Sequence, residues 1–220
     1  TATSTAVSVT VDSTAPVDGL AHQWKFDETS GATALDSAGT NSAILSNSLW
    51  VTGKTGNAAS FNGTNALGDA GKIDFGTGNF TVAHWVNVNG FKNFAGIFNN
   101  RSSASGNAGF HTRTDGTGTI TALIDFGATS KNLAVTNAVA GTWYHVAVSV
   151  DRAGLMKLYV NAVLSGQIDI SAFNAASITN TDNVRLGRDQ TSNYFNGAID
   201  DLRIYNRALS AADILQVYNE

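Results

Sequence analysis

The sequence predicts an all-β protein built as an antiparallel β-sandwich and closed by one short C-terminal helix. Around ten short segments rich in aromatic and β-branched residues recur along the 220 residues. Turn-forming pairs such as Asn62-Gly63, Asn89-Gly90 and Asp115-Gly116 separate them. Many short strands joined by such turns are typical of a sandwich.

The chain begins with a leader, residues 1–16, that differs in pattern from the rest of the sequence. Hydrophobic and polar residues alternate from Val7 to Val11, as in a half-buried strand, and the only proline, Pro16, ends the segment. A lone strand needs a partner, either in the main body as an edge strand or in another domain. The segment resembles the last strand and linker of a bacterial Ig-like repeat. We therefore expect a leader from a preceding domain and one domain over residues 17–220.

The strands of the main domain are predicted from alternation and flanking turns. In chain order they are His22–Phe26, Ala58–Phe61, Phe80–Val88, Gly96–Asn100, Gly109–Thr114, Thr119–Phe126, Trp143–Val150, Leu155–Val160, Asn183–Gly187 and Gly197–Tyr205. The helix begins after Ser210, because Asp213 stands where a capping box places its acidic residue. Ile214, Leu215 and Tyr218 then follow at helical spacing.

Composition excludes several classes of function. Charged residues make up 14% of the chain, against about 25% in an average protein, and Ser, Thr and Asn fill the gap. A net charge of −4 with scattered Lys and Arg offers no basic surface for nucleic acid. The absence of Cys removes thiol catalysis, thiolate zinc sites and disulfides. No apolar run is long enough for a membrane span, so we expect no membrane insertion. We also expect the domain to be monomeric.

The acidic residues do not predict a glycoside hydrolase. Such an enzyme needs two carboxyl groups roughly 5–10 Å apart across the scissile bond. The only two glutamates are Glu28, in an early loop, and Glu220, the last residue, and Asp125 stands alone on its strand. The neighbouring Asp200 and Asp201 point to opposite faces if their strand is regular.

A polysaccharide lyase stays open as a less favoured alternative. Elimination needs a base and a cation near the uronate carboxyl group, and His111, Arg113 and a tyrosine would meet that need. A groove lined by His111, Arg113 and Asp125 would favour this interpretation. Nucleophile-elbow and P-loop patterns are absent from the sequence.

Three blocks in a consistent order resemble the laminin-G-like, concanavalin A-like jelly-roll family over roughly residues 20–220. They are His22–Gly31 with Asp36–Gly39, Trp50–Gly63 with Phe80–Val86, and Phe195–Ser210 with the terminal helix. The resemblance implies a jelly-roll sandwich. It does not settle function, because this scaffold carries binding modules, adhesion modules and enzymes.

The resemblance also implies a structural Ca²⁺. It places the strand before Asp27 antiparallel to the strand that carries Asp200, with Asp36 in the following loop within reach. Converging carboxylates repel one another unless a cation neutralises them, and calcium takes hard oxygen ligands. The alternative is that Asp27 and Asp36 only make turn hydrogen bonds.

Aromatic side chains suggest where a sugar would stack. Trp24, Trp85 and Trp143 lie within apolar strands, so we expect them to be packed in the interior. Four aromatic residues flank turns or loops and are candidates for an exposed sugar platform: Trp50, Phe91, Phe94 and Tyr194.

Polar residues on neighbouring strands complete the candidate sugar site. The block Asn99-Asn100-Arg101 precedes a strand on which His111 and Arg113 share one side. Arg101, His111 and Arg113 would suit an acidic sugar. The alternative is the ordinary polar outer face of an antiparallel sheet.

We therefore expect a non-catalytic carbohydrate-binding module, with covalently linked neighbouring domains, from a larger secreted or cell-surface bacterial protein. A protein-contact or spacer module of an adhesin is the alternative from another class, and a lyase or hydrolase is less favoured. A shallow face with Tyr194 or Trp50 exposed on it would favour glycan recognition.

Overall fold

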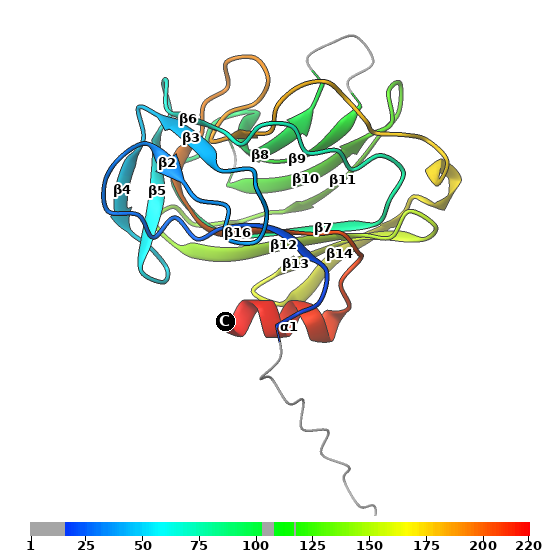
Figure 1. Cartoon of the computed structure of the whole chain (residues 1–220). Helices are drawn as coiled ribbons and strands as arrows, with labels where there is room; N and C mark the ends of the chain where they lie inside the picture. The colour runs from blue at the N-terminus through cyan, green and yellow to red at the C-terminus, as the bar shows by residue number, and fades with distance from the viewer. Residues whose placement is uncertain (1–15, 103–107, 117) are drawn as a thin grey trace, which may run out of the picture.

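A computed structural model describes residues 16–102, 108–116 and 118–220, and it confirms the predicted sandwich. Two antiparallel sheets of eight strands each lie face to face, with one helix below them (Figure 1). The leader strand predicted before Pro16 lies outside the described residues.

The back sheet is the one that contacts the helix. Its strands, in spatial order, are β14 (Val163–Asp169), β13 (Leu155–Val160), β12 (Trp143–Val150), β7 (Phe80–Gly90), β16 (Asn196–Tyr205), β5 (Asn57–Asn62) and β4 (Leu49–Thr52), with β1 (Leu20–Trp24) paired to β16. Trp24 pairs with Leu202 in antiparallel register. This confirms the expectation that the first and last strands of the domain are neighbours.

The front sheet is the second layer. Its strands, in spatial order, are β11 (Ser130–Val135), β10 (Thr119–Asp125), β9 (Gly109–Asp115), β8 (Ala95–Arg101), β15 (Arg185–Leu186), β6 (Leu67–Asp69), β3 (Ala43–Ser46) and β2 (Thr33–Ala34). A single 3₁₀ turn, Ser171–Phe173, follows β14.

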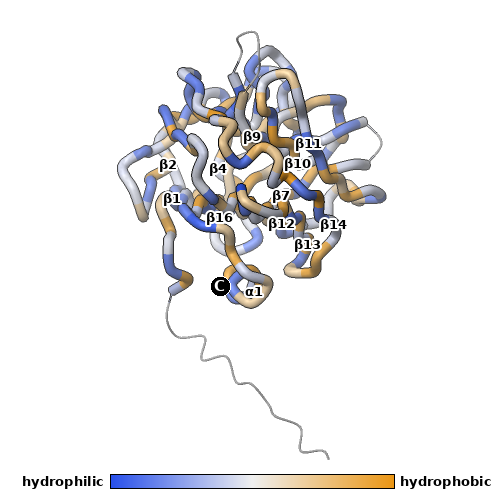
Figure 2. Tube along the Cα trace, turned by 90° about the vertical axis from the view of Figure 1, so that its right-hand side faces the viewer, coloured by the Kyte–Doolittle hydropathy of each residue, from blue (hydrophilic) through white to orange (hydrophobic). Residues whose placement is uncertain are grey.

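The hydrophobic core fills the space between the sheets. Alternate residues of each strand point inward, and the hydrophobic stretches of the chain gather around β7 and β10 (Figure 2). Phe75 stacks on Phe80 with ring centroids 4.1 Å apart, and Phe80 meets Phe110 edge-on at 5.2 Å. Each such buried ring contributes about 1.5–3 kcal/mol to stability.

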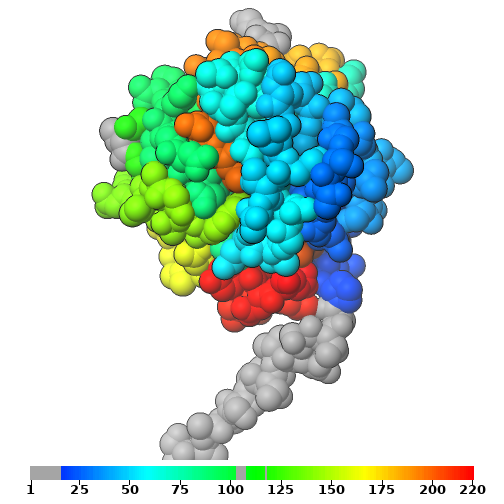
Figure 3. All heavy atoms as spheres, turned by 90° about the vertical axis from the view of Figure 1, so that its left-hand side faces the viewer, coloured from blue at the N-terminus to red at the C-terminus, as the bar shows by residue number. Residues whose placement is uncertain are grey.

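Helix α1 (Ala211–Asn219) covers the outer face of the back sheet. Ser210 and Asp213 form the predicted capping box, which satisfies backbone N–H groups at the start of the helix. Ile214 and Val217 pack on small side chains of β7 and β12, Ala83 and Ala147. Figure 3 shows the helix (red) beneath the sandwich, beside the first described residues (blue). The outer face of the front sheet carries no helix in the described residues, so a ligand can reach it.

Several strands escape prediction from sequence. β11 and β14 are edge strands with few buried positions, and β14 exposes Val163 and Leu164, so neither shows a clear alternation of buried apolar and exposed polar residues. β2, β3, β4 and β6 have four residues or fewer, too short for a periodic signal. Within the described residues, α1 is the only α-helix, and it lacks the length and hydropathy to cross a bilayer.

Candidate functional site

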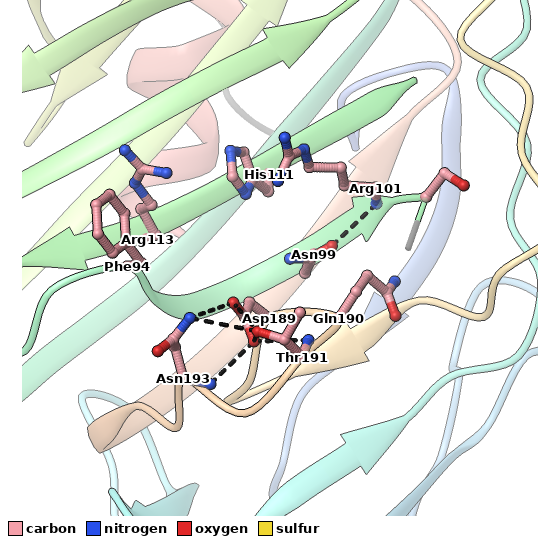
Figure 4. Close-up of a pocket in the computed structure, with 10 residues that line it drawn as sticks. Phe94, Asn99, Arg101, His111, Arg113, Asp189, Gln190, Thr191 and Asn193 are labelled. Atoms are coloured by element: carbon pink, nitrogen blue, oxygen red, sulfur yellow. Dashed lines mark hydrogen bonds between the residues drawn. The ribbon is translucent and has the colours of Figure 1, made fainter. Parts of the chain in front are cut away.

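A hollow of about 340 Å³ lies on the outer face of the front sheet. Strands β8 and β9 form its floor, and the loop over residues 188–193 forms one wall (Figure 4). The lining residues are Phe94, Asn99, Arg101, Ser102, His111, Arg113, Asp189, Gln190, Thr191 and Asn193.

Strand alternation places the floor residues. Phe110 and Thr112 of β9 point into the core, so His111 and Arg113 point outward between them. On β8, Asn99 is paired with His111, and its side-chain oxygen accepts a hydrogen bond from the Arg101 backbone N–H at 2.9 Å. The prediction that 111 and 113 share one side is confirmed.

His111 is a buried polar group without a protein partner. Its residue is only 3% exposed, and neither ring nitrogen has a hydrogen bond in the described structure. Burial, together with the positive charges of Arg113 and Arg101, lowers the pKa of His111 to about 3. At neutral pH it is therefore an uncharged ring with one donor and one acceptor, and the residue lines the hollow.

Both arginines of the floor lie beside acids. Arg101 Nε is 2.6 Å from Asp125 Oδ2, and the Asp125 side chain is buried and also bonded to the Ser130 hydroxyl. Arg113 Nε is 3.7 Å from Asp115 Oδ1. The lyase alternative groups Asp125 with His111 and Arg113, but no sequence pattern pairs either arginine with an acid.

Phe94 is the aromatic residue that reaches the hollow. It is 51% exposed, and its backbone has a φ of +59°, which side chains larger than Gly or Asn seldom adopt. The guanidinium of Arg113 lies over one face of its ring, 4.6 Å from the centroid. An exposed apolar ring held on strained backbone makes Phe94 a candidate functional position.

The loop over residues 188–193 is bonded internally through one carboxylate. Asp189 accepts hydrogen bonds from the backbone N–H groups of Thr191 and Asn193, both at 2.9 Å, and from the Thr191 hydroxyl. Although burial would raise the pKa of Asp189, these hydrogen bonds lower it. Gln190 Nε2 donates to the Asn183 carbonyl at 3.2 Å and ties the loop to the sheet.

The remaining predicted sugar-binding residues lie elsewhere. Trp50 is half-buried on β4 of the back sheet, and its Nε1 donates to the Gly31 carbonyl at 3.0 Å. Phe91 is partly buried against the core. Tyr194 is half-buried, with Arg188 over its ring at 5.7 Å, and follows the wall without lining the hollow. Arg101, His111 and Arg113 are thus brought together, whereas Trp50, Phe91 and Tyr194 are not.

Two of the predicted calcium ligands share a second groove, of about 640 Å³, beside α1. Asp27 Oδ1 accepts from the Asn57 N–H at 3.1 Å, and Asp200 Oδ2 accepts from the N–H groups of Lys54 at 2.8 Å and Thr55 at 3.1 Å. Both therefore contact the turn between β4 and β5. Burial raises the pKa of Asp200 to about 6.

Asp36 does not line the groove that Asp27 and Asp200 share. Its buried carboxylate accepts from the N–H groups of Gln23, Gly39 and Asn41 and lies 2.7 Å from His22 Nδ1. These contacts lower its pKa to about 2 against the effect of burial. Across residues 16–102, 108–116 and 118–220, no three His, Asp or Glu side chains gather as a metal site. In the described residues the Asp36 carboxylate is bonded within its own 36–41 loop and does not line the groove that Asp27 and Asp200 share.

Asp200 and Asp201 are expected to point apart if their strand is regular, and that condition is not met. The register of β16 shifts between Asp200 and Arg203, and Asp201 has a φ of +43°. This bulge turns both carboxylates toward the groove beside α1. Arg203 contacts Asp201 at 2.7 Å and also pairs with Glu220.

The comparisons with known proteins agree with this architecture. A family model described as the concanavalin A-like lectin/glucanases superfamily, of laminin G type, matches residues 62–215. A search of curated proteins found no match.

Solved structures resemble the fold at low sequence identity. Domain 4 of AbnA, an extracellular GH43 arabinanase from Geobacillus stearothermophilus, in complex with arabinotriose, has a TM-score of 0.70 and 20% identity, over 90% of this chain and 98% of that one. The binding domain of Paraclostridial Mosquitocidal Protein 1 has a TM-score of 0.72 and 16% identity, over 92% of this chain and 52% of that one.

A botulinum neurotoxin type C structure, whose title reports cell entry dependent on two ganglioside molecules, has a TM-score of 0.71 and 13% identity, over 92% of this chain and 51% of that one. This chain therefore spans about half the length of the toxin structures. At these identities the likeness shows the fold alone. The ligands named in these titles are those of the similar proteins.

Proposed function

Because the chain belongs to the concanavalin A-like lectin/glucanase superfamily, we propose that it is a non-catalytic carbohydrate-binding module of a larger secreted or cell-surface bacterial protein. The relatives support this proposal, since they include binding domains and a domain in complex with arabinotriose from an extracellular enzyme. Linked neighbouring domains are part of the proposal.

One observation carries the assignment of the site. His111 is buried at the floor of the hollow with both ring nitrogens unpartnered, next to the exposed ring of Phe94. An unpartnered buried polar group is unfavourable unless a ligand completes its hydrogen bonds. A sugar offers hydroxyl groups to the imidazole and an apolar C–H face to the aromatic ring.

The hollow supports catalysis less well. His111, with a pKa lowered to about 3, is a weak base at neutral pH, and the Asp125 carboxylate is engaged by Arg101. The tyrosine that a lyase would need is not among the lining residues. These features favour binding over elimination or hydrolysis.

A broad glycan array tests the function, with Phe94→Ala and Leu49→Ala as matched variants. Leu49 is an exposed residue of β4, in the back sheet, so its substitution controls for the loss of a surface apolar side chain. We expect selective binding by wild type and Leu49→Ala and at least tenfold weaker binding by Phe94→Ala. No binding across the whole array would favour the adhesin spacer instead.

A structural calcium is also part of the proposal. Asp27 and Asp200 would hold it, since both carboxylates line one groove and contact one turn, and Asp36 would not. Backbone oxygens and water commonly complete such a coordination shell. The ion would neutralise these carboxylates and secure the turn between β4 and β5, with no role in chemistry.

A further inference from the structure

The charges around the hollow cancel one another. Three arginines, Arg101, Arg113 and Arg188, lie at or next to it, as do three aspartates, Asp115, Asp125 and Asp189. His111 adds a polar side chain but no charge. The hollow therefore has no surplus positive charge to attract an anion.

Arg101 cannot easily turn to a ligand. Its partner Asp125 is 1% exposed, so a guanidinium that left it would strand a buried carboxylate. Leaving one member of a buried ion pair without its partner is strongly unfavourable. The pair is therefore a stable part of the floor.

The other charged groups also have neighbours, but Arg113 is held less closely: its Nε is 3.7 Å from Asp115 Oδ1 and has no hydrogen-bond partner. Arg113 lies between Asp115 and the ring of Phe94. Arg188 Nε donates to the Asp189 carbonyl at 3.0 Å, and the Asp189 carboxylate, bonded within its own loop, lines the wall. A ligand carboxylate in the hollow would thus face an existing carboxylate and displace paired cations.

The groups that the hollow still offers to a ligand are uncharged hydrogen-bond donors and acceptors. The His111 ring offers one donor and one acceptor, and the side chains of Asn99, Gln190 and Thr191 line the same space. Hydroxyl groups donate and accept in the same way, whereas carboxylates only accept.

We propose that the hollow selects uncharged glycans over those that carry uronate or sialate groups. This rests on the proposed glycan-binding function and names the class of sugar. It replaces the acidic sugar that the basic residues alone suggested, because the structure pairs each of the floor arginines with an acid.

The test compares each glycan bound on the array with its own charged or uncharged counterpart. Oxidation of primary hydroxyl groups converts a neutral glycan to its uronate form, and carboxyl reduction does the reverse. We expect the uncharged member to bind at least tenfold more tightly, with little change between about 50 and 500 mM NaCl. Tighter binding of the anionic member, or a steep loss with salt, overturns the inference and leaves glycan binding intact. No binding to any glycan overturns the function itself.

Two variants test the cause. Asp125→Asn and Asp115→Asn each remove an acid beside a floor arginine while keeping the side-chain shape, so each should shift the preference several-fold toward the anionic member. Asp169→Asn, an exposed position on β14, makes the same charge change on the back sheet and should not shift it. Because Asp115 is only partly buried, its variant tests the idea even if Asp125→Asn folds poorly. An unchanged preference in folded variants would overturn the proposed role of charge pairing.

Discussion

The guanidinium of Arg113 lies against one face of the Phe94 ring, 4.6 Å from its centroid, and both residues line the hollow. One ring face is thus occupied by a cation held on β9, while the side chain stays about half exposed. Arg113 of β9 and Phe94 in the turn before β8 together place one exposed aromatic ring beside the polar floor. This relationship leads to the first prediction.

Phe94→Asn should separate binding from stability. Asn adopts a φ near +59° more readily than Phe, so the free energy of unfolding should stay unchanged or rise by up to about 1 kcal/mol. Glycan affinity should fall at least tenfold because the platform is lost. Urea unfolding and isothermal titration with the array ligand measure the two effects. A variant that binds like wild type would remove Phe94 from the site.

His111→Leu should weaken binding without weakening the fold. The substitution replaces a buried imidazole that has no protein partner, so the free energy of unfolding should change by less than about 1 kcal/mol or increase. Affinity for the same glycan should fall at least tenfold. If instead the variant unfolds readily and the residual folded protein binds normally, His111 has a structural role only.

Gly96→Ala should displace the wall of the hollow. A Cβ at this position would meet the carbonyl carbon of Arg188 at 2.5 Å and the amide nitrogen of Asp189 at 2.6 Å, both backbone atoms that cannot swing aside. We expect about 1–3 kcal/mol of destabilisation and weaker glycan binding. Gly31→Ala is the comparison, because space there is open although φ is positive, so it should lower stability alone. Equal loss of affinity in both variants would argue against a role for the wall.

Stability should fall on acidification below about pH 6.5. Burial lowers the pKa of His84 and His111 to about 3 and that of His145 to about 4, so the unfolded chain binds protons that the folded chain does not. Their contribution is complete above pH 6.5 and declines toward pH 3–4, by up to about 1.4 kcal/mol per pH unit for each histidine. In calcium-free buffer Asp200, whose pKa burial raises to about 6, acts in the opposite direction between pH 6 and 4.

Denaturant unfolding at pH 7.5, 6 and 5 measures this slope. His111→Gln should reduce the slope of the unfolding free energy against pH by the contribution of about one proton, because one of the three histidines no longer titrates. A free energy of unfolding that stays flat from pH 7 to pH 5 would show that these histidines are hydrated in the native protein.

Chelation should lower the melting temperature if the proposed calcium is present. Wild type should melt several degrees lower in EDTA than in 1 mM calcium. Asp27→Asn should lose this difference, whereas Asp36→Asn should keep it while melting lower in both buffers, since the Asp36 carboxylate orders its loop. Equal melting temperatures of wild type in the two buffers would rule out the proposed structural calcium.

Part of the site is predictable from local pattern. Strand alternation places His111 and Arg113 on one face, because a period of two is a local property of the chain. Phe94 is a candidate among other turn aromatics, but Trp50 and Phe91 look equally suitable in the sequence, because exposure depends on which element packs over a residue. In the sequence, only a turn-like spacing marks the wall residues Asp189, Thr191 and Asn193.

Local signals in the sequence were enough to predict the all-β sandwich, the central strands and the capped terminal helix, since hydrophobic period and turn residues are read along the chain. The pairing of the first strand with the last was expected only from the family resemblance. Only the tertiary structure decided which polar groups come into contact. Asp125 neutralises Arg101 across neighbouring strands, a bulge turns Asp200 and Asp201 to one side, and Asp36 is retained by its own loop. Such pairings depend on register and loop paths between distant segments, and no local pattern encodes them.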